Sequence, residues 1–211
     1  MVINKRPGES SEFPELGTDY TPGRAGERFP VPVHRLDVPV SGCLLLARTP
    51  EAAAFLGAAF ARHGEVEKRY WAIVEKPAGG IFPASETRSE ELVHWLSFDP
   101  AKNKSFVHDK AGHGRKKAVL RYRIAGSGEN YLFLEIDLVT GRHHQIRSQL
   151  AAVGLHIKGD LKYGSRRSEK AGGIRLHAHS LTFPNPLNPS EKIKAAAMPP
   201  EMDTLWEAAK F

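Results

Sequence analysis

The alternation of apolar and polar residues predicts a chain built mainly from short strands. Residues 42–47 form an apolar run that is typical of a buried strand, and residues 68–74 combine β-branched with aromatic side chains. Residues 92–96 combine β-branched and aromatic side chains more weakly, and residues 174–183 indicate another strand. These four segments predict the framework of a β-sheet.

Two further segments predict an antiparallel hairpin. Residues 118–124 and 131–139 alternate in character on either side of the turn-forming sequence at 127–130. Because the strands follow one another mostly in hairpin order with few helices between them, we expect an α+β fold. Its central sheet should be mixed, mainly antiparallel and flanked by helices.

The first predicted helix has a strong start signal. Thr49 can cap the helix through its hydroxyl, Pro50 fits the first turn, and Glu51 lies near the positive end of the helix dipole. The helix should cover about residues 50–62 and stop at Gly64.

Two more helices follow in the second half of the chain. Residues 143–153 have a helical pattern that ends at Gly154. A short helix should begin after the proline pair at 199–200. It places Met202, Leu205 and Trp206 at i, i+3 and i+4, a spacing that favours docking on the core.

The N-terminal region is rich in residues that disfavour regular structure. Residues 5–33 contain five prolines and four glycines, which predicts a loop that leads into the segment around Asp37. At 211 residues, the chain has the size of one catalytic unit. We expect a Pro/Gly-rich segment over residues 1–30 and a single domain over residues 31–211.

Composition excludes some classes of protein and favours others. The chain is 41% hydrophobic and 26% charged, and no apolar run approaches the roughly 18 residues that span a membrane. Cys43, the only cysteine, lies within an apolar run, and the first residues do not resemble a signal peptide. These features imply no membrane role and favour a reducing, cytoplasmic setting.

Positive charge is concentrated in two tracts. Residues 102–123 carry eight Lys or Arg against Asp109, and residues 142–175 carry eight more against Asp160 and Glu169. The rest of the chain has more acidic than basic residues. Such segregation suits a surface that follows a phosphate backbone, although a solvated charged face is the alternative.

Asp37 is the leading candidate for a catalytic carboxylate. It closes the sequence His34-Arg35-Leu36-Asp37 and is followed by a Ser-Gly turn and the apolar run, so the scaffold can hold it rigidly. Arg35 either shares a strand face with Asp37 or reaches outward to a ligand.

A second candidate site is the strand-to-helix junction over residues 140–147. Its glycine permits a sharp turn, and its amide groups together with Arg142 and Arg147 form a natural anion site. An ordinary helix start with exposed basic residues is the alternative. The histidines at 143, 144, 177 and 179 lack the i, i+4 spacing of metal ligands and have no cysteine cluster to support them, so we expect no metal.

Several motifs taken together resemble the RluA-type family of RNA pseudouridine synthases. The resemblance covers about residues 31–207. Its motifs are His34-Arg35-Leu36-Asp37 with Ser41-Gly42; Lys68-Arg69-Tyr70-Trp71-Ala72; Thr140-Gly141-Arg142-His143-His144-Gln145-Ile146-Arg147; Gly154; Lys158-Gly159-Asp160; Tyr163-Gly164; Leu176-His177-Ala178-His179; and Leu181-Thr182-Phe183. The resemblance implies the pseudouridine synthase fold, with an RNA-binding cleft.

The resemblance also implies a role for each motif residue. Asp37 would attack a flipped-out uridine, either at the anomeric carbon or at ring carbon 6, without any cofactor. Tyr70 would stack on the target base and could take part in the final proton removal. Arg142 would pair with Asp37 and keep it ionised. Arg35 would enter the RNA and help fill the space left by the extruded base.

Some assignments leave alternatives open. Tyr70 is also readable as a core aromatic residue, and Ile146 either lines the uracil site or belongs to the core face of its helix. Arg147, Lys116 and Lys117 are candidate RNA contacts. For Asp160, which lies in a family turn motif, we expect a structural role.

The expected partner is structured ribosomal or transfer RNA, bound by a monomer with no nucleotide cofactor. The sequence has Val40 where family members commonly carry threonine. We expect no small S4-type RNA-binding domain in front of the catalytic domain. One alternative is an RNA-binding or RNA-folding factor of the same fold that has lost catalysis. A glycoside hydrolase ranks last, because those enzymes generally use two carboxylates.

Overall fold

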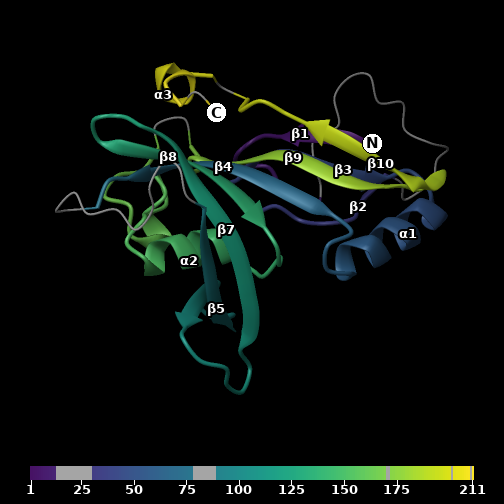
Figure 1. Ribbon diagram of the computed structural model, residues 1–211, viewed down its shortest axis with the longest axis horizontal. Coiled ribbons are helices and arrows are strands. Elements are labelled where there is room, and N and C mark those ends of the chain that lie inside the picture. Colours follow the sequence, from purple (N-terminus) through teal and green to yellow (C-terminus); the bar gives the residue numbers. More distant parts are fainter. Residues whose placement is uncertain (13–29, 78–88, 170–171, 201, 210) are drawn as a thin grey trace.

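The computed structural model describes residues 1–12, 30–77, 89–169, 172–200, 202–209 and 211 (Figure 1). Ten strands in this part of the chain form one sheet. The strands are β1 (Val2–Lys5), β2 (Val31–Pro32), β3 (Ser41–Ala47), β4 (Glu67–Glu75), β5 (Glu90–Asp99), β6 (Lys104–His108), β7 (Lys116–Ser127), β8 (Tyr131–Leu138), β9 (Leu176–Asn185) and β10 (Asn188–Ala196). The helices are α1 (Pro50–Ala61), α2 (Gln145–Ala152), a 3₁₀ turn (Leu161–Tyr163) and α3 (Thr204–Glu207).

The sheet is mixed and mainly antiparallel, as the sequence predicts. Its order is β1-β3-β9-β4-β8-β7-β5-β6, with β10 added to β9 and β2 to β3. Among the described pairings, only that of β3 with β9 is parallel. This pairing sets Ser41 beside His177 and Gly42 beside Ala178, so two motifs that lie far apart in sequence meet within the sheet.

Strand β4 is buried on both faces, which explains its nearly continuous apolar sequence. Tyr70, Ala72 and Val74 belong to the large core that also includes residues of α2. Trp71 and Ile73 point the other way, into a cluster that contains Trp206 of α3. Figure 1 shows α1 at one end of the sheet, where it packs on β3 and β9, whereas α2 contacts β5 and β6.

Most of the predicted elements are confirmed, with shifted ends. The first helix begins where predicted, and the Thr49 hydroxyl accepts a hydrogen bond from the Ala52 amide. The predicted hairpin is present as β7, which is longer than predicted at both ends, and β8, which ends one residue earlier than predicted. The helix predicted to start at residue 143 starts at Gln145, because His144 has a left-handed backbone with φ of 50°.

The C-terminal prediction is only partly correct. Trp206 is buried and Leu205 packs against the same cluster, as expected. Met202 instead precedes α3 and is 43% exposed, so it does not dock on the core. Helix α3 begins at Thr204, with Asp203 as its cap, which leaves Met202 outside the helical spacing.

The N-terminal segment contributes to the sheet at its start. Strand β1 pairs with β3 over its whole length, and the buried ammonium group of Lys5 donates hydrogen bonds to the carbonyl groups of Arg6, Glu9 and Val38. Most of the predicted loop, residues 13–29, lies outside the described residues. The division of the chain at residue 30 stays a prediction. No helix in the described part of the chain is both long and apolar enough to cross a membrane.

Candidate active site

Asp37 lies on the loop between β2 and β3, and hydrogen bonds on both sides of it hold the backbone of this loop. The Ser11 hydroxyl bonds both the amide and the carbonyl group of Leu36, and the Val40 amide donates to the Asp37 carbonyl at 2.9 Å. The carboxylate borders two cavities, of about 640 and 360 Å³, which also share Arg35, His144 and Arg147. With 25% of its side chain exposed, the carboxylate is held in place and is still open to a ligand.

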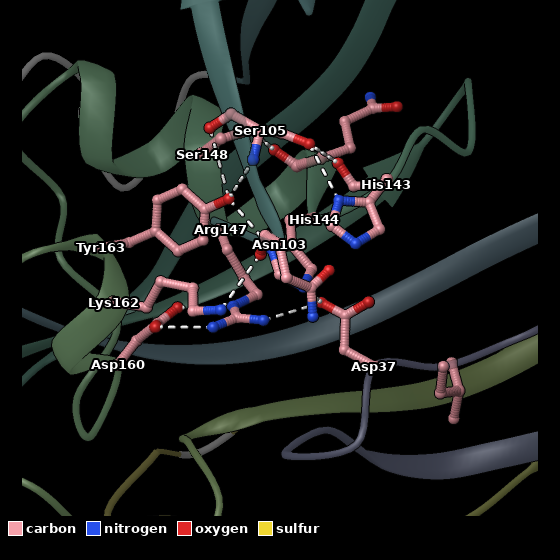
Figure 2. A network of polar contacts seen from close by, with 12 residues as sticks. Asp37, Asn103, Ser105, His143, His144, Arg147, Ser148, Asp160, Lys162 and Tyr163 are labelled. Carbon is pink, nitrogen blue, oxygen red and sulfur yellow. Dashed lines mark hydrogen bonds and ion pairs between the residues drawn. The ribbon is translucent and has the colours of Figure 1, made fainter. Parts of the chain in front are cut away.

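The cationic partner of Asp37 is Arg147, and the predicted pairing with Arg142 is wrong. Nη1 of Arg147 donates to Oδ2 of Asp37 at 3.1 Å (Figure 2). Nε of Arg142 donates to the Lys117 carbonyl at 3.1 Å instead, although the Arg142 side chain borders the larger cavity.

The local structure at the start of α2 explains this difference. The side-chain oxygen of Gln145 accepts hydrogen bonds from the Thr140 hydroxyl and the Arg142 amide, which fixes the turn before the helix. Arg142 therefore lies before the helix, on the side of Lys117. Arg147 lies in the first turn of α2, where its side chain is buried and points toward Asp37.

Arg147 also binds a second carboxylate, that of Asp160. Nε and Nη2 of Arg147 donate to the two oxygens of Asp160 at 2.7 and 2.8 Å, and the Asp160 side chain is only 1% exposed. The Tyr163 ring lies 5.0 Å from the guanidinium carbon. Burial opposes the charge of Arg147, but the hydrogen bonds to Asp160 and Asp37 outweigh that effect and raise its pKa.

His144 forms the second contact with the Asp37 carboxylate. Its Nε2 lies 3.6 Å from Oδ2, and its Nδ1 lies 3.0 Å from the Tyr163 hydroxyl, which accepts a hydrogen bond from the Ser105 amide. Burial, reinforced by the positive charge of Arg147, lowers the pKa of His144 to about 3. The imidazole is therefore neutral near pH 7.

Tyr70 and Ile146 border the larger cavity and also belong to the core. Both side chains are buried, and both pack in the cluster between the sheet and α2. Burial raises the pKa of Tyr70, with a further contribution from the negative charge of Asp37, so its hydroxyl stays protonated near pH 7. The sequence left two alternatives open for each residue, a place in the core or a place at the site. Both hold for Tyr70 and for Ile146, because each side chain packs in the core and also borders the larger cavity.

The remaining predicted residues are exposed cations: Arg35 borders both cavities, whereas Lys116 and Lys117 border neither. The Arg35 side chain is 70% exposed and lies 3.6 Å from the Glu12 carboxylate. Lys116 and Lys117 are exposed at the start of β7, and the Lys117 carbonyl accepts the hydrogen bond from Arg142. These three cations are accessible to a large ligand.

Sequence reasoning missed four residues of this site: Lys68, His144, Asp160 and Tyr163. Lys68 borders the larger cavity and precedes Tyr70 by two positions on β4, so the two-residue period of a strand could have identified it. The other three lie in motifs that the sequence analysis quoted. Their contact with Arg147 or Asp37 depends on tertiary structure, for which the sequence alone gave no signal.

The other histidines have structural contacts. His177 bonds the Ser41 hydroxyl through Nδ1 and the Ala197 carbonyl through Nε2, and His179 stacks on Trp71 with ring centroids 3.6 Å apart. The described residues contain no group of three His, Cys, Asp or Glu side chains that could hold a metal ion.

Comparisons with known proteins show the family of this chain. The family model described as RNA pseudouridylate synthase matches residues 1–152. An uncharacterized RNA pseudouridine synthase of Zymomonas mobilis is 38% identical over 156 residues, which cover 74% of this chain and 67% of the relative. The ribosomal large subunit pseudouridine synthase D of the same organism is 33% identical, over 88% of this chain and 58% of the relative. The tRNA pseudouridine synthase C of Haemophilus ducreyi is 31% identical, over 83% and 74%.

Solved structures show the same fold. Human RNA pseudouridylate synthase domain containing 4 superimposes with a TM-score of 0.68 at 21% identity, over 99% of this chain and 87% of that one. Human RNA pseudouridylate synthase domain containing 1 gives a TM-score of 0.65 at 23% identity, over 80% and 69%. The chain spans about three fifths to two thirds of the length of the first curated relatives that it matches. On the family match and these identities, the chain belongs to the RNA pseudouridylate synthase family.

Proposed function

We propose that this chain isomerises uridine to pseudouridine in structured ribosomal or transfer RNA, with Asp37 as the nucleophile. The observation that carries the proposal is the Asp37 carboxylate itself. It borders two cavities and is paired with the buried Arg147. It also lies close enough to Tyr70 for its negative charge to contribute to the raised pKa of the Tyr70 hydroxyl. The relatives named for the ribosomal large subunit and for tRNA support the choice of RNA classes.

The reaction needs one nucleophile and a site in which the base can rotate. Asp37 attacks the anomeric carbon or ring carbon 6 and forms a covalent bond there, and the bond between the ribose and N1 of uracil breaks. The base turns within the cavity and rejoins the ribose through carbon 5, and the bond to Asp37 breaks again, which restores the carboxylate. Carbon 5 then loses its proton and N1 takes one up, so the product has the same composition as uridine. No electrons are gained or lost overall, so the isomerisation needs no redox cofactor.

The surrounding residues bind and orient the nucleotide. Tyr70, a neutral phenol near pH 7, provides an aromatic surface for the flipped base, and Ile146 contacts it from α2. Flipping costs on the order of a few kcal/mol of stacking and pairing, and Arg35 at the exposed entrance fills the space that is left. Arg142, Lys116 and Lys117 bind phosphates around the cavity. We place the enzyme in the cytoplasm as a monomer.

Tritium release tests this proposal. Total RNA labelled with [5-³H]uridine, from cells that lack this protein, is incubated with the wild type or with Asp37→Ala. The wild type should release tritium as pseudouridine forms, whereas Asp37→Ala should release none and still bind the RNA. An active Asp37→Ala variant would contradict the assignment of Asp37. Binding without release by the wild type would favour an RNA-binding factor that has lost catalysis.

A further inference from the structure

The two oxygens of the Asp37 carboxylate are not equivalent. Arg147 at 3.1 Å and His144 at 3.6 Å both approach Oδ2. Within the described part of the chain, Oδ1 accepts no hydrogen bond, and both of the closest charged contacts of Asp37 are made through Oδ2. One oxygen is therefore held by the protein and the other is left for a ligand.

Asp160 determines where Arg147 can donate. Its carboxylate accepts hydrogen bonds from Nε and Nη2, so Nη1 is the nitrogen that is left to donate to Asp37 (Figure 2). The guanidinium group is planar and rigid, and the Tyr163 ring packs against it. Because Asp160 is buried and bidentate, it fixes the direction of Nη1 and thereby the position of Oδ2.

Tyr163 determines which nitrogen of His144 carries the proton. The Tyr163 hydroxyl accepts the Ser105 amide hydrogen at 2.8 Å and has a single proton of its own to donate. Nδ1 of His144 at 3.0 Å is a nearer acceptor than the Ser105 carbonyl at 3.3 Å. Donation to Nδ1 leaves the proton of the neutral ring on Nε2, facing Oδ2. The other tautomer would set a lone pair against the carboxylate.

The arrangement also divides one positive charge between two carboxylates. Arg147 pairs with both Asp37 and Asp160, so it neutralises the charge of Asp37 less completely than an arginine that paired with Asp37 alone would. A carboxylate that keeps more of its charge is a better nucleophile. If Arg147 were free of Asp160, it could turn both of its amino groups toward Asp37 and cover Oδ1.

We propose that Asp160 and Tyr163 are positioning residues that act through Arg147 and His144 to fix Oδ2 of Asp37, so that Oδ1 is the oxygen that attacks uridine. The inference rests on the proposed function, because it assumes that Asp37 is the nucleophile. It adds an outer pair of residues, neither of which contacts the substrate, and assigns separate roles to the two carboxylate oxygens.

The decisive variant is Asp160→Asn, measured in single-turnover tritium release on the labelled total RNA. We expect the rate at saturating enzyme to fall at least tenfold, while the enzyme concentration for half-saturation changes less than threefold. Asp160→Glu keeps the negative charge and both acceptor oxygens, so it should retain more of the saturating rate than Asp160→Asn.

Glu135→Gln is the matched control for loss of a partly buried ion pair. Glu135 pairs with Arg69 and Arg123 and lies opposite Trp71, on the sheet face away from Tyr70. Its loss should lower thermal stability and leave the saturating rate near that of the wild type. A wild-type rate in Asp160→Asn would overturn the inference, and so would an equal loss of rate in Glu135→Gln.

Tyr163→Phe gives an independent test if Asp160→Asn does not fold. This variant removes the proton donor to Nδ1 of His144 and keeps the ring against Arg147. The saturating rate should fall several-fold at unchanged half-saturation, and an unchanged rate would overturn the role of Tyr163. Asp37→Ala distinguishes a failure of the proposed function from a failure of the positioning role. An active Asp37→Ala refutes the proposed function, whereas an inactive Asp37→Ala beside wild-type Asp160→Asn and Tyr163→Phe refutes only the positioning role.

Discussion

Gly42 of β3 lies so close to Ala178 of β9 that a Cβ atom at position 42 would be 2.3 Å from the Ala178 carbonyl oxygen. Gly42 also has φ of +119°, a conformation that other residues rarely adopt. Only glycine therefore fits where β3 leaves the loop that carries Asp37. The turn that the sequence predicts at Ser41-Gly42 is wrong: this pair begins β3, and the turn lies just before it at Val38 and Pro39.

Gly42→Ala should destabilise the protein strongly. The backbone strain and the clash together should cost on the order of 3 kcal/mol or more, and lower the melting temperature by roughly 10 °C. Gly57→Ala is the control, since a Cβ at this position in α1 would meet no atom within 4 Å. It should stabilise the protein by about 0.5–1 kcal/mol. Equal melting temperatures for the two variants would contradict this account.

Arg147 and Arg142 should respond differently to substitution. Arg147→Ala removes the partner of Asp37 and leaves Asp160 buried without its counter-charge, which should cost about 3–5 kcal/mol of folding free energy. Arg147→Lys keeps the charge but not the three-way donation, so its saturating rate should fall at least roughly tenfold. Arg142→Ala should mainly weaken RNA binding. Kinetics on the labelled RNA separate the two effects. A larger loss of saturating rate in Arg142→Ala than in Arg147→Lys would support the pairing of Arg142 with Asp37 that the family resemblance implies.

Charge reversal at Lys116 and Lys117 should weaken RNA binding and flatten its salt dependence. Each lost phosphate contact should lower the slope of log K against log salt by about 1. Filter binding of total tRNA at several salt concentrations measures both quantities. Lys192→Glu, at an exposed position on the outer strand β10, is the control. Unchanged affinity and slope in the double variant would show that the tract is only a solvated surface.

Stability should decrease as the pH falls below about 6.5. Burial lowers the pKa of His34 to about 3 and that of His177 to about 4, against 6.5 in the unfolded chain. The unfolded state therefore takes up protons near pH 6.5 that the folded state refuses, and each such histidine costs up to about 1.4 kcal/mol per pH unit below that value. The stability that these groups contribute is complete above pH 6.5 and is lost toward pH 3 to 4.

Urea unfolding at pH 7, 5.5 and 4.5 measures this decrease. Nε2 of His34 accepts the Leu45 amide hydrogen, a role that the carbonyl of a glutamine can take. His34→Gln should therefore show a pH dependence that is flatter by about one proton. The exposed His113→Gln is the control for losing a histidine. A wild-type slope in His34→Gln would rule out His34 as a source of the pH dependence.

The sequence could predict features that depend on local chemistry. The hydroxyl of Thr49 and the proline after it define the start of α1 without help from the rest of the fold. Residues in recognisable motifs, such as Asp37 and Tyr70, could be placed at one site because the family resemblance brings them together. Strands β6 and β10, which lie at edges of the sheet, carry few apolar residues and so lack the signal on which strand prediction depends.

Features that depend on tertiary structure could not be predicted. Arg142 and Arg147 occur in one motif, and the choice between them depends on where α2 begins. The left-handed backbone of His144 delays that start by two residues, or about 200° of helix rotation. The contact of Arg147 with Asp160 is also invisible in the sequence, because spacing gives no measure of which side chains share a buried guanidinium group.

The parallel pairing of β3 with β9 has a consequence for the order of synthesis. Asp37 is made early, whereas Arg147, Asp160 and the β9 strand that lines up with Ser41 and Gly42 are made late. A growing chain therefore carries Asp37 long before it has Arg147 and Asp160. Strand β9 is made later still, so a ribosome-bound fragment that ends before residue 176 contains these charged groups but lacks the strand that pairs with Ser41 and Gly42 next to the Asp37 loop.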